Sequence, residues 1–460
     1  GLVFHFWGIS GLSLSAFAPY VLWIHTEIFT AFLVAGFTYH YLTQPADGNR
    51  RHAIWMGVFL AGATALKPPL IILGLPAVLP ILRKKQWRAP VIFLAALIIL
   101  STLTVVLTGD INPYGGNRKI FTQQFPLDTG FDAFVKGHAW SMESAGFHFN
   151  WNVLSWNILF FWIGRFSGLL WYFFPGVMAV TLALIHHRNR RVSALLTTIG
   201  FLILIQIVMI PANYHGGGGA LGNRLFVSLY PVLIMSLPGI PRMRILVPAT
   251  LLAALFSGPF LVTPWKSSYQ PGNFTRSGFY RFLPVEWTLT GAFPIFDPGW
   301  YRAELPGLNG HAYFLDRYTT GKIDDGFSIF EGGRSRFILE LDAPVPTLDL
   351  IVSSTDYPME GTVKARSHPV NFSVSPEHSI SLHLPLGPGH IRRDIFGITR
   401  WIYPVSCRIR RTEEKNDATG NVAGRGVAHF RIGTQAPEPK RSARPGDHPP
   451  MKNLLRMYNE

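Results

Sequence analysis

The stretch "VIFLAALIILSTLTVVL", residues 91–107, contains no charged residue and is close to the length of a helix that crosses a bilayer. A second run, "LLTTIGFLILIQIVMI" (195–210), has the same character. A hydrocarbon core of ~30 Å requires about 20 apolar residues in a helix, and a helix satisfies its own backbone in lipid, so both runs predict transmembrane helices. With 460 residues, 48% of them hydrophobic, the composition is typical of a membrane protein that carries a soluble part.

The net charge of +15 would suit a nucleic-acid partner, but its distribution argues against one. The basic residues gather in short loops between apolar runs, and these loops contain a single acidic residue, Asp47. This pattern predicts four cytoplasmic turns by the positive-inside rule. The single cysteine, Cys407, excludes an internal disulfide and a cysteine-based zinc site. The basic residues of the four turns are Arg50, Arg51, Arg83, Lys84, Lys85, Arg88, Arg188, Arg190, Arg191, Arg242 and Arg244.

Placing these loops inside predicts a helical membrane domain over residues 1–263, with about seven full or cut spanning helices and an external loop at 109–165. Residue 1 falls inside an apolar stretch, so we expect the sequence to be truncated at its N-terminus. The expected helices cover residues 1–17, 24–43, 90–108, 166–186, 192–210, 224–238 and 244–262.

Segment 53–82 has basic residues at both ends, so it must enter and leave the membrane by the same face. Each of its arms is too short to cross, since ~14 residues at ~1.5 Å rise cover only about 20 Å. We therefore expect a broken hairpin with Lys67, Pro68 and Pro69 near its tip.

A different pattern follows the last apolar run. After a linker at 264–307, segments such as "SRFILELDA" and "VNFSVSP" alternate apolar and polar residues between turn-forming residues. They predict an antiparallel β-sandwich over 308–410, outside the membrane. Residues 411–460 are basic, polar and aperiodic, and are predicted to be disordered.

The stretch "NYHGGGGALGNRLFVSLYP" (213–231) places glycines and an arginine at the start of an expected helix. Backbone N–H groups of consecutive glycines can form an anion-binding nest, and a helix start adds positive dipole. The alternative is a flexible loop whose arginine reaches lipid headgroups. The residues that would hold a phosphate are His215, Gly218, Gly219, Asn223 and Arg224.

Lys67 is the second candidate, because a charge at a break between half-helices normally faces a cavity or a partner, and we expect it to bind the same lipid phosphate as Arg224. The alternative is a structural pair with Glu27, near His25. In the external loop, Asp110 is a weak candidate for a general base, and its alternative is a turn aspartate before Asn-Pro. Further polar candidates in that loop are Tyr114, Arg118 and His148. His138, His148 and His215 have no ligand-like spacing, so no metal site is predicted.

Four segments resemble the polytopic GT-C glycosyltransferases, the group that holds the aminoarabinose transferase and the protein O-mannosyltransferases. The segments are "APYVLWIHTEIFTAFLVAGFTYHYL" (18–42), "GVFLAGATALKPPLIILGLPAVLPIL" (57–82), "NILFFWIGRFSGLLWYFFPG" (157–176) and "GGGGALGNRLFVSLYPVLI" (216–234). The resemblance implies transfer of a sugar from a polyprenyl-phosphate carrier to a glycan, lipid or protein acceptor. It also implies a catalytic carboxylate in a first external loop, which we expect to precede residue 1.

The resemblance further implies an integral protein of a bacterial inner membrane whose β-sandwich is extracytoplasmic. No cofactor is required in this scheme, although a divalent cation stays an alternative, and no nucleic acid takes part. Two other functions compete: a flippase or transporter of lipid-linked saccharides, in which broken helices are also expected, and a polymerase or ligase of lipid-linked polymers.

Overall fold

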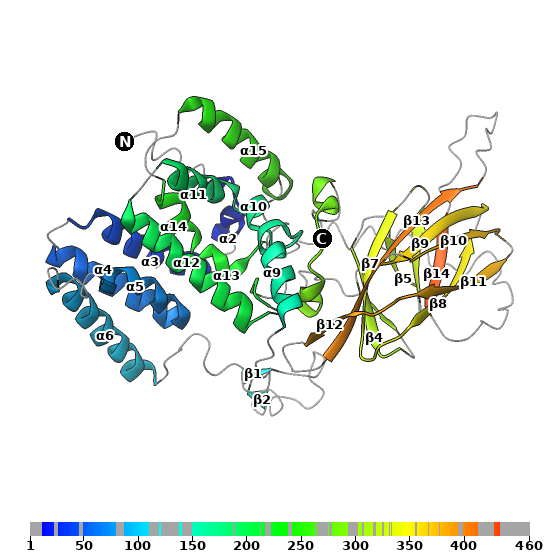
Figure 1. Cartoon of the computed structure of the whole chain (residues 1–460), viewed down its shortest axis with the longest axis horizontal. Helices are drawn as coiled ribbons and strands as arrows, with labels where there is room; N and C mark the ends of the chain where they lie inside the picture. The colour runs from blue at the N-terminus through cyan, green and yellow to red at the C-terminus, as the bar shows by residue number, and fades with distance from the viewer. Residues whose placement is uncertain are drawn as a thin grey trace, which may run out of the picture.

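The computed structural model consists of a helical part and a β part (Figure 1). In Figure 1 the helices lie at one end of the molecule and the sheets at the other, with α9 (Trp151–Ile163), α10 (Leu169–Tyr172) and β12 (His390–Arg393) near the junction. The structure describes residues 12–22, 26–45, 49–79, 87–109, 119–120, 138–139, 150–186, 189–211, 213–216, 222–237, 242–262, 264, 275, 278–292, 302–305, 308–315, 319–323, 326–330, 332, 334–354, 357–366, 368–376, 378–393, 399–412 and 427–432.

Within these ranges, three helices are long and apolar enough to cross a membrane. They fall on three of the predicted spans, where the sequence contains its longest charge-free apolar runs. Other helices of the same part are shorter or carry polar residues. The three long helices are α6 (Arg88–Thr108), α12 (Arg190–Met209) and α15 (Met243–Leu261), and the others are α2 (Phe17–Leu22), α3 (Thr26–Thr43), α4 (Arg50–Leu66), α5 (Leu75–Val78), α11 (Phe174–His186), α13 (Arg224–Val227) and α14 (Tyr230–Met235).

The break predicted at Lys67 is present. Helix α4 ends at Leu66, Lys67 has an extended backbone, and the 3₁₀ helix η1 (Pro68–Gly74) starts at the two prolines. Proline suits a first helical position but disfavours helix in the residue before it, which explains the stop. The second arm packs against the first. Gly74 of η1 lies so close to Leu60 of α4 that a Cβ on Gly74 would contact the leucine side chain.

Two predicted spans are wrong as continuous helices. Within the predicted span 224–238, residues 224–235 form the short helices α13 and α14, with Ser228 and Leu229 between them, and most of their side chains are buried. Residues 166–186 are divided at Phe173 into α10 and α11. The apolar side chains of the first segment pack against protein, whereas the sequence analysis expected this run to be a continuous membrane span.

The external loop predicted at 109–165 is also wrong over its last part, because residues 151–163 form helix α9. Asn150 caps this helix by accepting hydrogen bonds from the backbone N–H groups of Asn152 and Val153. The strands β1 (Lys119–Ile120) and β2 (His138–Ala139) pair within the same loop.

The β part is a sandwich of two antiparallel sheets, as the alternation predicted. The seven-stranded sheet has the order β10-β9-β13-β7-β4-β3, with β12 paired to β13, and the five-stranded sheet has the order β11-β8-β14-β6-β5. Aromatic side chains of the two sheets meet in the core, for example Phe327 and Phe337 with ring centroids 4.8 Å apart. The strands are β3 (Arg302–Leu305), β4 (Gly310–Phe314), β5 (Thr319–Ile323), β6 (Gly326–Phe330), β7 (Arg334–Leu341), β8 (Thr347–Ser354), β9 (Met359–Ala365), β10 (His368–Val374), β11 (Ser379–Pro385), β13 (Thr399–Arg411) and β14 (Val427–Ile432).

The prediction of disorder over 411–460 is wrong for β14, which pairs with both β6 and β8 in the middle of its sheet. Ala428 and Phe430 alternate with more exposed residues and are buried in the sandwich core. The run "VAHFRI" alternates apolar and polar residues as a strand does. It is short and lies in a polar segment, so the composition of the whole segment predicted disorder. Strand β3 likewise lies inside the predicted linker 264–307.

Candidate anion-binding site

The candidate site is built around Glu27, in the first turn of α3. Its side chain is 2% exposed, and Thr26 Oγ1 donates a hydrogen bond to Glu27 Oε2 at 2.9 Å. An acidic residue at a helix start is favoured by the helix dipole. The depth of burial is not explained by the dipole alone, since a buried carboxylate needs charged partners.

Lys67 supplies the first of these partners. The break between α4 and η1 points its side chain at α3, where Nζ lies 3.4 Å from Glu27 Oε1. The same nitrogen donates to Ser228 Oγ at 3.4 Å. Ser228 follows α13, so Lys67 connects three separate segments of the helical part.

Arg224 supplies the second partner, and its Nε lies 3.2 Å from the same Glu27 Oε1. The start of α13 is fixed locally: Asn223 accepts a hydrogen bond from the N–H of Phe226, and the N–H of Arg224 donates to the carbonyl of His215. Gly216 makes this close turn possible with φ +98, where a Cβ would lie 2.9 Å from Arg224 Cβ.

The cluster contains more positive than negative charge. In the described part of the chain Glu27 is the carboxylate within ion-pair distance of Lys67 and Arg224, so two cations share one anion and a net charge of +1 remains. The lysine and arginine side chains are 16% and 23% exposed, against 2% for the carboxylate. The surplus positive charge therefore lies at the accessible side of the cluster, where an anion could reach it.

The structure brings together Lys67, Arg224 and Glu27 from the sequence-based candidates. His215 and Asn223 adjoin them through the turn that positions Arg224, and both side chains are buried. Ser228 was missed, although its place four residues after Arg224 on a helical stretch was a usable signal. The remaining candidates lie outside the described residues: His25, Asp110, Tyr114, Arg118, His148, Gly218 and Gly219.

A second buried carboxyl, Glu286, lies where the helical part meets the β part. Its Oε1 accepts hydrogen bonds from the N–H groups of Phe166 and Ser167, both at 2.8 Å, and from Ser167 Oγ at 3.0 Å. Gly164 lies so close that a Cβ there would collide with Glu286 Oε1. Burial raises the pKa of Glu286 to about 7, against the opposing effect of the hydrogen bonds.

Arg165 fixes the same junction. Its fully buried guanidinium donates to the carbonyl oxygens of Leu315, at 2.7 Å, and of Arg281. From the sandwich side, Arg392 donates to the carbonyl of Thr288 at 3.2 Å and pairs with Glu340. We interpret Arg165 and Arg392 as structural, because they donate to backbone carbonyl oxygens and Arg392 also pairs with Glu340.

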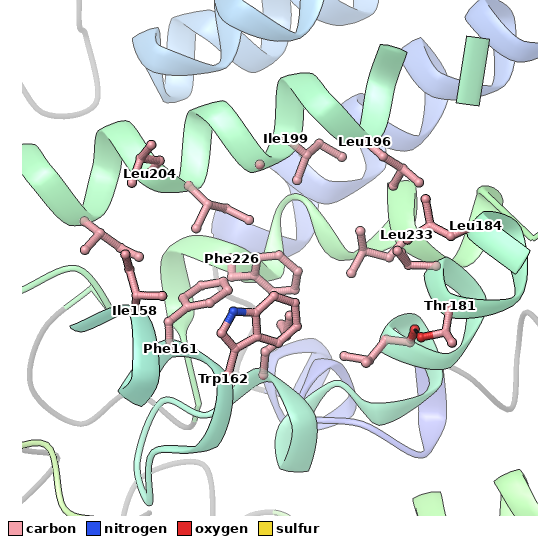
Figure 2. A pocket seen from close by; sticks show the side chains of 16 residues that line it. Ile158, Phe161, Trp162, Thr181, Leu184, Leu196, Ile199, Leu204, Phe226 and Leu233 are labelled. Carbon is pink, nitrogen blue, oxygen red and sulfur yellow. Dashed lines mark hydrogen bonds between the residues drawn. The ribbon is translucent and has the colours of Figure 1, made fainter. Parts of the chain in front are cut away.

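An apolar groove of about 480 Å³ lies between α9, α11 and α12 (Figure 2). Figure 2 shows Phe161, Trp162 and Phe226 on one side of it and Leu196 and Leu233 on another. Its hydroxyl group, on Thr181, already donates to the Val177 carbonyl at 2.9 Å, so the groove suits hydrocarbon rather than polar ligands. Phe226 and Arg224 are two residues apart on α13, so the groove and the charged cluster lie on different sides of that helix.

Comparison with known proteins identifies no relative. No family model and no curated protein matches the chain. Among solved structures, TmCBM61 in complex with β-1,4-galactotriose is 10% identical over 27% of this chain and 82% of its own, with a TM-score of 0.15. Vicilin from Corylus avellana (hazelnut) is 14% identical over 26% of this chain and 32% of its own, with a TM-score of 0.12. At these TM-scores neither likeness carries an argument about fold or function.

Proposed function

We propose that this chain is a membrane-embedded glycosyltransferase that moves a sugar from a polyprenyl-phosphate carrier to an acceptor on the extracytoplasmic face of a bacterial inner membrane. The long apolar helices α6, α12 and α15 support the membrane location. The cluster of Glu27, Lys67 and Arg224 supports recognition of the carrier phosphate.

The observation that carries the proposal is the surplus cation. A structural ion pair that buries Glu27 needs one positive partner, whereas two converge on a single oxygen atom. A second cation in a partly buried site costs desolvation and repulsion unless an anion joins it. A phosphate at the exposed side of Lys67 and Arg224 would supply that anion through charge-assisted hydrogen bonds.

In the proposed reaction the bond between the sugar anomeric carbon and the phosphate oxygen breaks, and the polyprenyl phosphate leaves with the electron pair. The acceptor hydroxyl oxygen forms the new bond and loses its proton to a base. Lys67 and Arg224 would stabilise the negative charge that develops on the leaving phosphate. Glu27 is a poor candidate for the base, because its Oε1 already lies within ion-pair distance of both Lys67 and Arg224. Asp110, the sequence-based candidate, lies outside the described residues.

A transporter or flippase of lipid-linked saccharides is the second candidate function. The break at Lys67 favours it, because interrupted helices with a charge at the break are also found in transporters. Both functions require the phosphate site. They differ in whether a sugar leaves the carrier, so a transfer assay separates them.

The test is binding of polyprenyl phosphate, with phosphate-free polyprenol as the reference ligand, by the full chain in lipid nanodiscs. Because each charge-assisted hydrogen bond contributes ~1.5–3 kcal/mol, we expect Arg224→Gln or Lys67→Met to weaken phosphate binding by about 10- to 150-fold. Polyprenol binding should be unchanged. Arg224→Lys should restore binding only in part, because a point charge does not replace the planar fork.

Arg190→Gln is the matched control, since it removes an exposed arginine at the start of α12. Unchanged phosphate binding in Arg224→Gln would refute the site. Release of labelled sugar to an acceptor by the native chain supports the transferase, whereas movement of intact carrier between leaflets without release supports the transporter.

A further inference from the structure

The turn at residues 213–216 packs directly against Arg224. Its His215 carbonyl accepts a hydrogen bond from the N–H of Arg224 at 2.8 Å. Gly216 lies against the arginine side chain, since a Cβ on this glycine would be 2.9 Å from Arg224 Cβ and 3.2 Å from Arg224 Nε. Nε is the atom within ion-pair distance of Glu27. A shift of the turn would therefore displace Arg224 within the anion site.

Two side-chain contacts hold this turn in place. Gln206 of α12 donates from Nε2 to the Tyr214 carbonyl at 2.5 Å. The Tyr214 side chain is fully buried, and its hydroxyl oxygen lies 3.1 Å from Ser167 Oγ. Ser167 has one hydroxyl proton and donates it to Glu286 Oε1 at 3.0 Å, so Tyr214 is the donor in the bond to Ser167. We call Tyr214, Ser167 and Glu286 the junction network.

The β-sandwich helps to hold the far end of the junction network. Glu286 immediately precedes the 3₁₀ segment η4 (Trp287–Ala292). The Thr288 carbonyl of η4 accepts a hydrogen bond from Arg392 of β12 at 3.2 Å. The network therefore connects a segment that contacts the sandwich to the turn that contacts the anion site.

The chemistry of the junction network differs from that of other buried tyrosines in this region. A buried tyrosine hydroxyl needs a hydrogen-bond partner, and Tyr172 and Tyr280 each donate to a backbone carbonyl. Tyr214 instead reaches a serine that is bonded to the carboxyl group of Glu286. Burying a carboxyl group costs free energy, so its use at the end of a network that reaches Arg224 favours a positioning role over packing alone.

We propose that Glu286 is a positioning residue for the anion site, acting through Ser167 and Tyr214 on the turn that supports Arg224. The sandwich, which helps to hold Glu286, thereby contributes to phosphate binding by the helical part. This inference rests on the phosphate site in the proposed function, but not on the sugar-transfer chemistry. Mutations along a contiguous network of this kind change affinity at the coupled site by roughly 2- to 30-fold.

The test is binding of polyprenyl phosphate and of polyprenol by the full chain in lipid nanodiscs. Tyr214→Phe removes only the hydroxyl that enters the junction network, and should weaken phosphate binding by roughly 2- to 30-fold while polyprenol binding stays unchanged. Tyr280→Phe is the matched control, since it removes the hydroxyl of another fully buried tyrosine, which donates to the Phe256 carbonyl of α15. This control should bind both ligands as the native chain does. Native-like phosphate binding by Tyr214→Phe would overturn the proposal.

Two variants of Glu286 separate positioning from packing. Glu286→Gln keeps a carbonyl oxygen that can accept from Ser167, whereas Glu286→Leu removes the acceptor. Glu286→Gln should therefore bind polyprenyl phosphate more tightly than Glu286→Leu. Equal phosphate affinity of the two folded variants would show that the acceptor has no role and would refute the proposal. If Glu286→Leu does not fold, the Tyr214→Phe result decides alone.

The double variant Arg224→Gln/Tyr214→Phe shows whether the effect passes through Arg224. Once this arginine is removed, loss of the Tyr214 hydroxyl should weaken phosphate binding no further. If the two losses multiply instead, the hydroxyl acts independently of Arg224 and the proposal is wrong.

Failure of this inference can be told apart from failure of the proposed function. Native-like phosphate binding by Arg224→Gln refutes the anion site, and the positioning role with it. Weakened phosphate binding by Arg224→Gln, together with native-like binding by Tyr214→Phe, refutes only the role of the junction network.

Discussion

Replacing Glu27 by glutamine should destabilise the helical part more than removing either of its cationic partners. Glutamine keeps the shape of the side chain but removes the charge that Lys67 and Arg224 share. Both cations lie within 3.4 Å of one glutamate oxygen, so they are within about 7 Å of each other and would repel across a partly buried space.

The magnitude follows from the burial. Removing one partner of a buried ion pair costs about 3–5 kcal/mol, and water reaches the partly exposed Lys67 and Arg224, so we expect the lower end, about 3 kcal/mol. At roughly 2–4 °C per kcal/mol for a unit of this size, Glu27→Gln should lower the melting temperature by about 6–12 °C. Lys67→Met should cost less, because it leaves one cation balanced by one carboxylate.

The assay is thermal unfolding of the full chain in detergent, with and without polyprenyl phosphate. A phosphate that binds between the two cations would replace the lost carboxylate charge. The ligand should therefore raise the melting temperature of Glu27→Gln more than that of the native chain. A ligand at 100 times its Kd stabilises by ~2.7 kcal/mol, enough to recover most of the loss.

Two results would refute this reasoning. If Lys67→Met costs as much as Glu27→Gln, the cations do not share the carboxylate and no surplus charge exists. The second result is that polyprenyl phosphate leaves the melting temperature of Glu27→Gln unchanged, while polyprenol shifts the native chain and Glu27→Gln equally. The cluster would then be a structural network without an anion site.

Three further predictions test other parts of the molecule. Truncation after Arg411 should unfold the sandwich because it removes the central strand β14, whereas truncation after Ile432 should leave its melting temperature unchanged; equal effects would contradict the strand assignment. Because the pKa of Glu286 is raised, its contribution to stability is present at low pH and is lost as pH rises from about 4.5 to 7. Glu286→Gln should therefore reduce the pH dependence of the melting temperature over that range. A pH dependence equal to that of the native chain would contradict this. In a chain whose native cysteine is replaced, Gly332→Cys should react with an impermeant thiol reagent in intact cells and Arg190→Cys should not; the reverse would invert the topology.

Much of the helical part could be predicted from the sequence, because long charge-free runs are stable in lipid as helices and the pair Pro68-Pro69 stops the helix that precedes it. The helices α6, α12 and α15 and the break at Lys67 follow from such local rules. The strands of the sandwich follow from alternation of period two. These features depend only on neighbouring residues, which a sequence shows directly.

The charged cluster depended on the tertiary structure. Lys67 and Ser228 are 161 residues apart, and no local sequence pattern predicts that both lie near Glu27. The sequence suggested one phosphate site for Lys67 and Arg224, with a pair of Lys67 and Glu27 as the alternative, and the folded chain directs both cations at the same Glu27 oxygen. Long-range convergence of this kind is set by how helices pack, which single-sequence periodicity does not encode.

Burial was the other property that only the tertiary structure decided. The apolar run at 224–238 has the composition of a membrane helix, yet most side chains of α13 and α14 are buried inside the protein. The short run at 427–432 lies in a polar tail, yet it completes a sheet. Hydrophobicity alone states that a side chain avoids water, and only the packed structure determines whether lipid, another helix or a neighbouring sheet takes the place of that water.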